Sequence, residues 1–445
     1  MKLLFVSLGC DKNLVDTEFM LGMLRDDGIE ITNDETEADI IIVNTCCFIN
    51  DAKEESVNTI LEMAEYKKTG PLKALIVTGC LAQRYKQEII DEIPEVDAVL
   101  GTTSYGDIVK ALNEAQAGNV FQEFRDINEL PEDSGRRVLT TGGHFGYLKI
   151  AEGCDKHCTY CIIPSLRGRF RSVPEERLLA QAEYMASQGV KELILVAQET
   201  TVYGTDLYGK KTLHILLKKL CQIKGIRWIR VLYCYPEEIY DELVQVMKEE
   251  KKICNYLDLP IQHASDRILK RMGRRTTRKQ LEDIIAKLRR EIPDIVLRTS
   301  LITGFPGETQ EDHEELMEFV DEMEFDRLGV FTYSPEEGTP AETMEGQVPE
   351  EVKEERRDEL MSLQQEISLE KGDERIGQEL VVMIEGKVSG ESAYIARTYA
   401  DAPKVDGYIF VQTGELLVTG DFARVRVTGA LEYDLIGELA DEYTE

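Results

Sequence analysis

Short apolar runs alternate with amphipathic stretches over the first hundred residues, and this alternation restricts the fold more than any other feature of the sequence. The runs are "KLLFVSLGC", "DIIIVNTCCFI", "KALIVTGCLAQ" and "VDAVLGTTSYG", and the first three are each followed by a helix-like stretch. Strand–helix alternation of this kind is typical of a mostly parallel sheet covered by helices. We therefore predict an N-terminal parallel α/β domain over residues 1–120.

Each of the first three predicted strands ends in a cysteine, namely Cys10, Cys46 and Cys80. Ligands in open parallel sheets bind beyond the carboxyl ends of the strands, so three thiols at the same topological position favour a shared metal site. The alternative is that each is a small buried apolar residue, as cysteine often is. Cys47 points to the opposite side of an extended chain and is interpreted as a packing residue.

The alternation is lost over residues 117–145, which are polar and Gly-rich and predict a linker. It then restarts, with six strand candidates separated by helical segments. Six such units predict a partial (β/α)6 barrel over residues 140–375, in which the functional loops follow the strands. The candidates are "YLKIAE", "ELILVAQ", "WIRVLYC", "YLDLPIQ", "VLRTSLITG" and "RLGVFTYS".

Short strands punctuated by turn residues follow from residue 376, and they predict a small antiparallel β-barrel over residues 376–445. This region has thirteen Asp and Glu against five Lys and Arg, and Asp401 and Asp406 are expected at its surface. The whole chain has a formal net charge of −32, so tight binding to nucleic acid is not expected. An acidic module suits a basic protein partner, although acidic surfaces also serve solubility.

The stretch "GCDKHCTYCIIPSLRGRF" follows the first strand of the predicted barrel and contains Cys154, Cys158 and Cys161. Structural zinc sites, and iron–sulfur clusters that only transfer electrons, usually have four protein ligands. Three thiolates on a 4Fe-4S cubane leave one iron open to a substrate or cofactor. His157 could complete a zinc site, but it is adjacent to Cys158, and neighbours in a tight loop rarely reach one metal.

This spacing, with Tyr160 just before the third cysteine, resembles the motif of the radical S-adenosylmethionine enzymes. The resemblance implies that the open iron chelates S-adenosylmethionine and that one electron releases a 5′-deoxyadenosyl radical, which abstracts a hydrogen atom. The implied cofactor contacts, besides Tyr160, lie at strand ends: Gln198 and Glu199 for the methionine end, Gln262 for the ribose, and Gly304 and Gly307 for the adenine. The alternative is that the glycines only shape turns.

The whole chain resembles the methylthiotransferases within that superfamily, which have a TRAM-like terminal barrel. This resemblance implies a second 4Fe-4S cluster on Cys10, Cys46 and Cys80, and two molecules of S-adenosylmethionine, one for the methyl group and one for the radical. Cys47 stands where the family usually has Gly or Ala, so either of the adjacent cysteines could bind iron. The motifs "SLGCDKNLVDTE" and "RTYADAPKVDG" resemble the branch that modifies the β-carbon of an aspartate in protein S-twelve of the small ribosomal subunit.

Two alternatives remain open: a transfer-RNA adenosine methylthiotransferase, and a non-catalytic iron–sulfur or zinc scaffold. The family resemblance also implies an electron donor such as flavodoxin or ferredoxin. No apolar run reaches eighteen residues, so no membrane span is expected, and "MKLLFVSLGC" is too short for a signal sequence. We therefore expect a cytoplasmic protein, and the sequence assigns no catalytic side chain.

Overall fold

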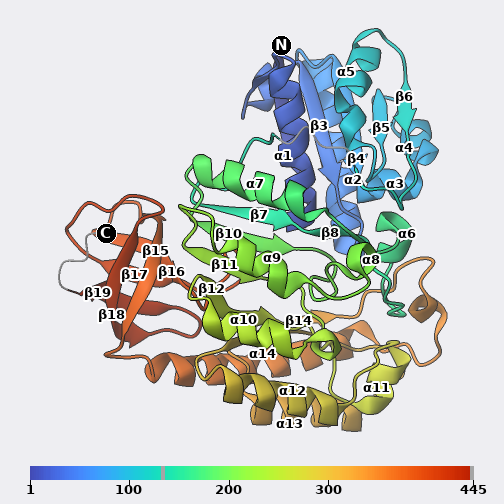
Figure 1. The fold of residues 1–445 in the computed structure, drawn as a ribbon. Coiled ribbons are helices and arrows are strands. Elements are labelled where there is room, and N and C mark those ends of the chain that lie inside the picture. The colour runs from blue at the N-terminus through green and yellow to red at the C-terminus, as the bar shows by residue number, and fades with distance from the viewer. Residues whose placement is uncertain (132–135, 441–445) are drawn as a thin grey trace.

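The computed structural model describes residues 1–131 and 136–440, and Figure 1 shows three units that follow one another along the chain. The first is the predicted parallel α/β domain. Its six strands pair in parallel in the order β2-β1-β3-β4-β5-β6. They are β1 (Lys2–Ser7), β2 (Glu30–Ile31), β3 (Ile40–Thr45), β4 (Ala74–Gly79), β5 (Ala98–Leu100) and β6 (Phe121–Glu123).

Helices cover both faces of this sheet, which explains why β3 and β4 are continuous apolar runs. Ile40 and Ile42 of β3 pack with α1 and α5, whereas Ile41 and Val43 pack with α2. The helices of this unit are α1 (Asp11–Asp26), α2 (Asn50–Thr69), α3 (Cys80–Tyr85), α4 (Gln87–Glu92) and α5 (Ile108–Gln116).

The stretch interpreted as a linker contains regular structure. Strand β6 pairs in parallel with β5 and completes the edge of the first sheet. Further on, Arg137 is buried and donates a hydrogen bond to the carbonyl of Tyr147 in the central unit. The prediction was wrong here because three half-buried residues, "FQE", are too short and too polar to show the pattern of a strand.

The central unit contains all six predicted strands as one parallel sheet in the order β14-β13-β12-β11-β10-β7. β7 and β14 are the two ends of this order, so the sheet is an open, partial barrel, as predicted. A two-stranded antiparallel ribbon, β8 (Ala151–Glu152) with β9 (Arg171–Ser172), flanks it. The six strands are β7 (Phe145–Lys149), β10 (Glu192–Val196), β11 (Trp228–Val231), β12 (Ile253–Asp258), β13 (Val296–Thr303) and β14 (Arg327–Thr332).

Helices line the outer side of this sheet (Figure 1). The last and longest, α14 (Glu350–Asp373), contacts α13 and β14 and leads into the third unit. Among the residues that the structure describes, no helix has the length and apolar character needed to cross a bilayer. The others are α6 (Ile163–Arg167), α7 (Glu175–Ser187), α8 (Thr205–Tyr208), α9 (Leu213–Leu220), α10 (Asp241–Glu249), α11 (Asp266–Arg271), α12 (Arg278–Glu291) and α13 (Gln310–Met323).

The third unit is a closed five-stranded barrel in the order β15-β16-β17-β19-β18. Four strand pairs are antiparallel, as predicted, but β17 and β19 run parallel. The alternation of inward and outward residues is the same in both kinds of pair, so the sequence could not show this. The strands are β15 (Glu379–Lys387), β16 (Ala393–Thr398), β17 (Ile409–Gln412), β18 (Phe422–Ala430) and β19 (Leu435–Leu439).

The small barrel is attached to the central unit by buried ion pairs. Arg397 donates to Glu192 at 2.7 Å, and Arg230 donates to the other oxygen of Glu192 at 2.8 Å. The expectation that Asp401 and Asp406 lie at the surface was wrong. Both side chains are buried against arginines of the central unit, Asp401 against Arg327 of β14 and Asp406 against Arg298 of β13.

One hydrophobic core runs through all three units. It joins Leu3 of the first sheet, Trp228 and Tyr256 of the central sheet, and Met383 and Phe422 of the small barrel. The rings of Trp228 and Phe422 meet edge to face, with their centroids 4.9 Å apart. The units are therefore packed together rather than strung on flexible connections.

Candidate active site

Cys10, Cys46 and Cys80 lie at the carboxyl ends of the adjacent strands β1, β3 and β4, and we call them the N-terminal thiol set. Cys10 precedes α1 and is exposed, whereas Cys46 and Cys80 are buried. Burial, with the neighbouring Cys80 and Cys10 adding to the shift, raises the pKa of Cys46 to about 12. Gly9 has φ +86°, and a Cβ built there would lie 3.0 Å from Sγ of Cys46. The three thiols thus lie near one another at the strand ends, and their role as a ligand set stays a prediction.

Asn13 and Arg167 border this set. The buried Asn13 amide donates to the carbonyls of Leu8 at 3.2 Å and Thr45 at 3.0 Å, which fixes two of the strand ends. Its Oδ1 accepts a hydrogen bond from Arg167, and Sγ of Cys80 lies 3.9 Å from the same oxygen. Arg167 belongs to the central unit, so that unit contributes a positive charge to a site on the first.

Cys46 and Cys47 occupy different surroundings. Cys46 lies against Gly9, beside Cys10. Cys47 is fully buried in the apolar cluster between the sheet and α2. Burial raises the pKa of Cys47 to about 12, with Cys80 adding to the shift and Arg84 opposing it.

Cys154, Cys158 and Cys161 follow β7 in one compact loop, and we call them the barrel thiol set. The amide of Cys154 donates to the carbonyl of Gly168 at 3.1 Å, and the amide of Cys161 donates to the carbonyl of Cys158 at 3.1 Å. Burial raises the pKa of Cys154 to about 11 and that of Cys161 to about 12. His157 is exposed, so this imidazole does not share the buried setting of the thiols.

No three His, Cys, Asp or Glu side chains within residues 1–131 and 136–440 are close enough to hold a single metal ion. In each thiol set, however, the cysteines affect one another's pKa, so they face a common space. Thiolates on different irons of a cubane lie farther apart than thiolates around one zinc ion. The three thiols of each set are within electrostatic reach of one another, as a cluster held by three thiolates requires.

Gln198 and Glu199 follow β10, and Glu199 lies beside the barrel thiol set. Burial raises the pKa of Glu199 to about 7, while Lys156, at 3.5 Å, lowers it. The charge of Glu199 in turn raises the pKa of Cys154. Oε1 of Gln198 is buried without a hydrogen-bond partner among the described residues. Of the two, Glu199 thus faces the loop that carries the thiols.

Gln262, at the end of β12, is held in a left-handed conformation with φ +73°. Its amide donates to the carbonyl of Ser300 at 2.9 Å, and its carbonyl accepts from Ile302 at 2.8 Å. The next residue, His263, is fully buried, and its Nδ1 accepts hydrogen bonds from the amides of Ala264 and Ser265. The backbone around Gln262 is therefore fixed before any ligand binds.

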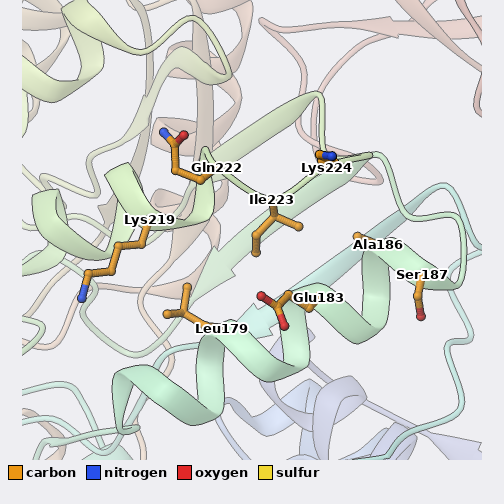
Figure 2. A pocket seen from close by; sticks show the side chains of 8 residues that line it. All are labelled: Leu179, Glu183, Ala186, Ser187, Lys219, Gln222, Ile223 and Lys224. Carbon is orange, nitrogen blue, oxygen red and sulfur yellow. The ribbon is translucent and has the colours of Figure 1, made fainter.

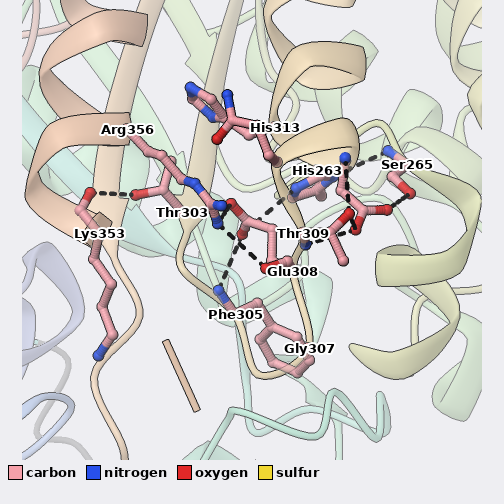
Figure 3. Close-up of polar contacts among 12 residues, drawn as sticks. His263, Ser265, Thr303, Phe305, Gly307, Glu308, Thr309, His313, Lys353 and Arg356 are labelled. Atoms are coloured by element: carbon pink, nitrogen blue, oxygen red, sulfur yellow. Dashed lines mark hydrogen bonds and ion pairs between the residues drawn. The ribbon is translucent and has the colours of Figure 1, made fainter. Parts of the chain in front are cut away.

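Glu308 supports the neighbouring loop, as Figure 3 shows. It accepts hydrogen bonds from the amide of Phe305 at 3.0 Å and from Arg356 at 2.9 Å, and it lies 3.7 Å from His263. The ring of Phe305 meets that of Tyr160 edge to face at 6.4 Å. The network thus connects the ends of β12 and β13 to the thiol loop.

Gly304 and Gly307 have positive φ angles of +69° and +85°. A Cβ at Gly304 would lie 2.1 Å from Cγ of Lys353 on α14, and a Cβ at Gly307 would lie 2.9 Å from Nε of Arg271. Both glycines are therefore required by turn geometry and by packing, whatever else they contact.

Two tyrosines that the sequence pattern did not single out follow β11. The ring of Tyr233 lies under Nζ of Lys12, 3.3 Å from the centroid, and its hydroxyl donates to Asp11 beside Cys10. The hydroxyl of Tyr235 lies 3.8 Å from Sγ of Cys158. Tyr233 also has φ +60°, which is strained for a residue with a Cβ. Only Cys234 separates the tyrosines, so the two thiol sets flank one short segment.

A surface groove lies elsewhere, between α7 and α9, and Leu179 and Ile223 line it (Figure 2). It contains no cysteine, and its helices cover the outside of the barrel. We therefore place the candidate active site at the strand ends, between the thiol sets.

Three family models match the chain in sequence order. The uncharacterised protein family UPF0004 matches residues 2–101, the radical SAM superfamily matches residues 148–320, and the TRAM domain matches residues 376–440. Among solved structures, the radical S-adenosylmethionine methyltransferase TsrM from Kitasatospora setae has a TM-score of 0.55 at 14% identity and covers 77% of both chains. The radical enzyme OxsB has a TM-score of 0.51 at 16% identity and covers 81% of this chain and 56% of its own. At sequence identities this low, the similarity to these two structures shows a shared fold and nothing more.

Closer relatives are similar over nearly the full length. The ribosomal protein uS12 methylthiotransferase RimO of Lachnoclostridium phytofermentans is 65% identical over 437 residues, covering 98% of this chain and 99% of the relative. The protein of the same name from Pelotomaculum thermopropionicum is 52% identical over 438 residues, covering 98% and 99%. With its two thiol sets and its three units in this order, the chain belongs to the family of radical S-adenosylmethionine methylthiotransferases that includes the uS12-modifying enzymes.

Proposed function

We propose that this protein attaches a methylthio group to the β-carbon of an aspartate in ribosomal protein uS12. The observation that carries the proposal is the placement of two three-thiol sets on either side of the segment Tyr233–Tyr235. Supporting it are the relatives named as uS12 methylthiotransferases, which align over 98% of the chain. We propose a separate role in this reaction for each of the three units, residues 1–120, 140–375 and 376–445.

The N-terminal thiol set would hold a second 4Fe-4S cluster. A cluster with three thiolates is a buried anion, and buried anions require a nearby cation. Arg167 meets this requirement because it is almost fully buried and adjacent to Cys80. We choose Cys46 rather than Cys47 as the third ligand, because the charge of Cys10 acts on the thiol of Cys46, whereas Cys47 is influenced only by Cys80 and Cys46 among the cysteines.

The barrel thiol set would hold the cluster that binds S-adenosylmethionine. When these groups are bound, the family's chemistry supplies the radical, the methyl group and the sulfur. Glu199 would accept a hydrogen bond from the amino group of the cofactor; its burial beside the Cys154 loop supports this role. Gln262 would contact the ribose from its fixed backbone, and Tyr160 would pack beside the cofactor.

The N-terminal unit has a second role in this arrangement, because it covers the strand ends. The cation–π contact of Lys12 with Tyr233 and the ion pair of Arg84 with Glu336 hold it there. Such a cover excludes water from a site where radicals would form. The substrate aspartate would then enter beside Cys10, which is the exposed member of the N-terminal set.

The charge of the small barrel supports a basic protein substrate less strongly than its composition suggested. Asp401 and Asp406 are buried in ion pairs, and Asp441, Glu442 and Glu445 lie outside the described residues. An excess of surface carboxylates remains, which would attract basic uS12 at long range. We propose that the reaction takes place in the cytoplasm, with flavodoxin or ferredoxin as the electron donor.

Anaerobic incubation with uS12, S-adenosylmethionine, sulfide and dithionite would test the proposal. Mass spectrometry should find one methylthio group on one aspartate of uS12. Cys46→Ala should abolish the product, and Cys47→Ala is the matched control that should retain it. If transfer RNA acquires the methylthio group and uS12 does not, the transfer-RNA alternative replaces this proposal.

A further inference from the structure

Residues 266–279 are strongly basic in a chain whose net charge is −32. We call them the basic segment; it spans α11, the turn after it and the start of α12. It contains seven cations and a single carboxylate, Asp266. The cations are Arg267, Lys270, Arg271, Arg274, Arg275, Arg278 and Lys279.

Lys270, Arg271 and Arg275 form no ion pair with a carboxylate in the described part of the chain. Lys270 and Arg275 are exposed, and Arg271 is half-buried and donates to the carbonyls of Pro306 and Glu345. The other four cations each face a carboxylate: Arg267 faces Asp312, Arg274 faces Glu237, Arg278 faces Glu282, Glu315, Glu318 and Glu322, and Lys279 faces Glu282 and Asp283.

The basic segment packs directly on the loop of the barrel thiol set. The amide of Thr159 donates to the carbonyl of Met272 at 2.9 Å, and its hydroxyl donates to the carbonyl of Arg271 at 2.8 Å. Gly273, with φ +73°, approaches so closely that a Cβ there would lie 2.7 Å from the carbonyl oxygen of His157. One layer of backbone therefore separates the surface of the segment from Cys158.

We propose that the basic segment is the docking surface for a small acidic protein that carries one electron. This inference rests on the proposed function, which needs a reductant. A chain of net charge −32 repels an acidic carrier over most of its surface, so a local basic patch would direct the carrier's approach. The reduced flavin or iron–sulfur centre of the carrier loses one electron, the centre held by the barrel thiol set gains it, and no bond forms or breaks.

The same cations could attract RNA, but the segment lacks the features of an RNA site. Surfaces that hold single-stranded RNA combine basic groups with aromatic rings for base stacking, and residues 266–279 contain no aromatic residue. The close contact with the thiol loop also has no role in holding RNA, whereas it shortens the path of an electron. These observations favour the protein partner.

The test compares two double charge reversals in the iron-loaded protein. Lys270→Glu with Arg275→Glu changes the exposed cations of the segment. Lys224→Glu with Lys251→Glu is the matched control, since it makes the same change in charge at exposed positions before β11 and β12, at the opposite ends of the strands. Stopped-flow absorbance would follow reduction by photoreduced flavodoxin, and fluorescence anisotropy would measure the binding of oxidised flavodoxin to the iron-free chain.

We expect the segment variant to be reduced about tenfold more slowly at low ionic strength and to bind flavodoxin correspondingly more weakly. The difference in the rate of reduction by flavodoxin between the variant and the wild-type chain should become smaller at high salt. Reduction by dithionite should be unchanged. Equal effects in both variants, or no effect in either, would overturn the proposal. So would loss of binding to a small-subunit RNA fragment without any loss of flavodoxin binding. If the wild-type chain reduced with dithionite fails to modify uS12, the proposed function fails instead.

Discussion

Replacing Arg167 with Met should weaken the contact between the N-terminal unit and the barrel. The guanidinium of Arg167 is almost fully buried, and it lies 2.9 Å from Asp16 of α1 and 3.5 Å from Glu152 of β8. Methionine retains much of the side-chain length but neither the charge nor the donors. Asp16 and Glu152 would then share Lys149 as their remaining cation.

The structure sets the size of this effect. Removing one partner of a buried ion pair costs about 3–5 kcal/mol, because the other charge is left uncompensated. Lys149 still pairs with both carboxylates, so we expect the lower end, about 3 kcal/mol. That corresponds to roughly a hundredfold increase in the population of the opened interface.

Hydrogen–deuterium exchange of the iron-free chain would measure this opening. Amides of α1 should exchange about a hundredfold faster in Arg167→Met, provided that they exchange through this local opening. Amides of α12, far from the interface, should not change. Arg169→Met is the matched control, because Arg169 is exposed in the same loop.

Iron content gives a second readout of the same substitution. Burial raises the pKa of Cys80 and Arg167 opposes that rise, so losing the guanidinium makes the thiolate harder to form. Iron binding requires thiolates, so Arg167→Met should lose roughly four irons to a chelator while the barrel set keeps its own. Exchange and iron retention equal to those of Arg169→Met would refute the reasoning.

Four further predictions follow from the site and the packing. Cys154→Ala should abolish cleavage of S-adenosylmethionine but retain roughly four irons per chain by anaerobic iron assay. Alanine at all three positions of the N-terminal thiol set should leave cleavage of S-adenosylmethionine to 5′-deoxyadenosine intact but abolish sulfur transfer to uS12. Cys47→Ala should retain both the cleavage and the sulfur transfer. The pKa of Glu199 is about 7 in the folded state and 4.5 ordinarily, so between pH 4.5 and about 7 the folded state binds more protons than the unfolded state. Stability of the iron-free chain should therefore fall as the pH rises from 4.5 to about 7, and denaturant titrations of Glu199→Gln should lack this slope. Asp401→Lys should weaken the attachment of the small barrel by about 3–5 kcal/mol, because it breaks a buried ion pair. Limited proteolysis should therefore cleave the barrel faster at any ionic strength, whereas substitution of an exposed carboxylate would leave cleavage unchanged.

The parallel α/β units could be predicted from local patterns, although the order of their strands could not. Alternating apolar runs specify parallel units, and strand ends in a parallel sheet meet at one edge, so Cys10, Cys46 and Cys80 could be grouped from their positions alone. The barrel thiol set is local in sequence, so its spacing could be compared directly with a family motif, and that resemblance predicted a site with an open iron position. Both predictions depend on short stretches of chain and on topology.

Contacts between units could not be predicted in the same way. Nothing near Arg167 in the sequence shows that it reaches Asn13, and nothing near Asp401 shows that Arg327 covers it. Tyr233 and Tyr235 look like the end of an apolar strand until the N-terminal unit is placed over them. Charge was the least informative feature, because counting carboxylates does not distinguish those that face water from those buried in ion pairs.

The core shared by Leu3, Trp228 and Phe422 limits how the family could be re-engineered. A chimera that takes its terminal barrel from a transfer-RNA-modifying relative would contain only one side of the interface between the barrel and the central unit. Phe422 would have to match Trp228, and Arg397 would have to match Glu192, before any change in substrate could be tested. Exchange of substrate specificity should therefore succeed with loops of the barrel and fail with the whole barrel, unless the facing residues of the central unit are exchanged with it.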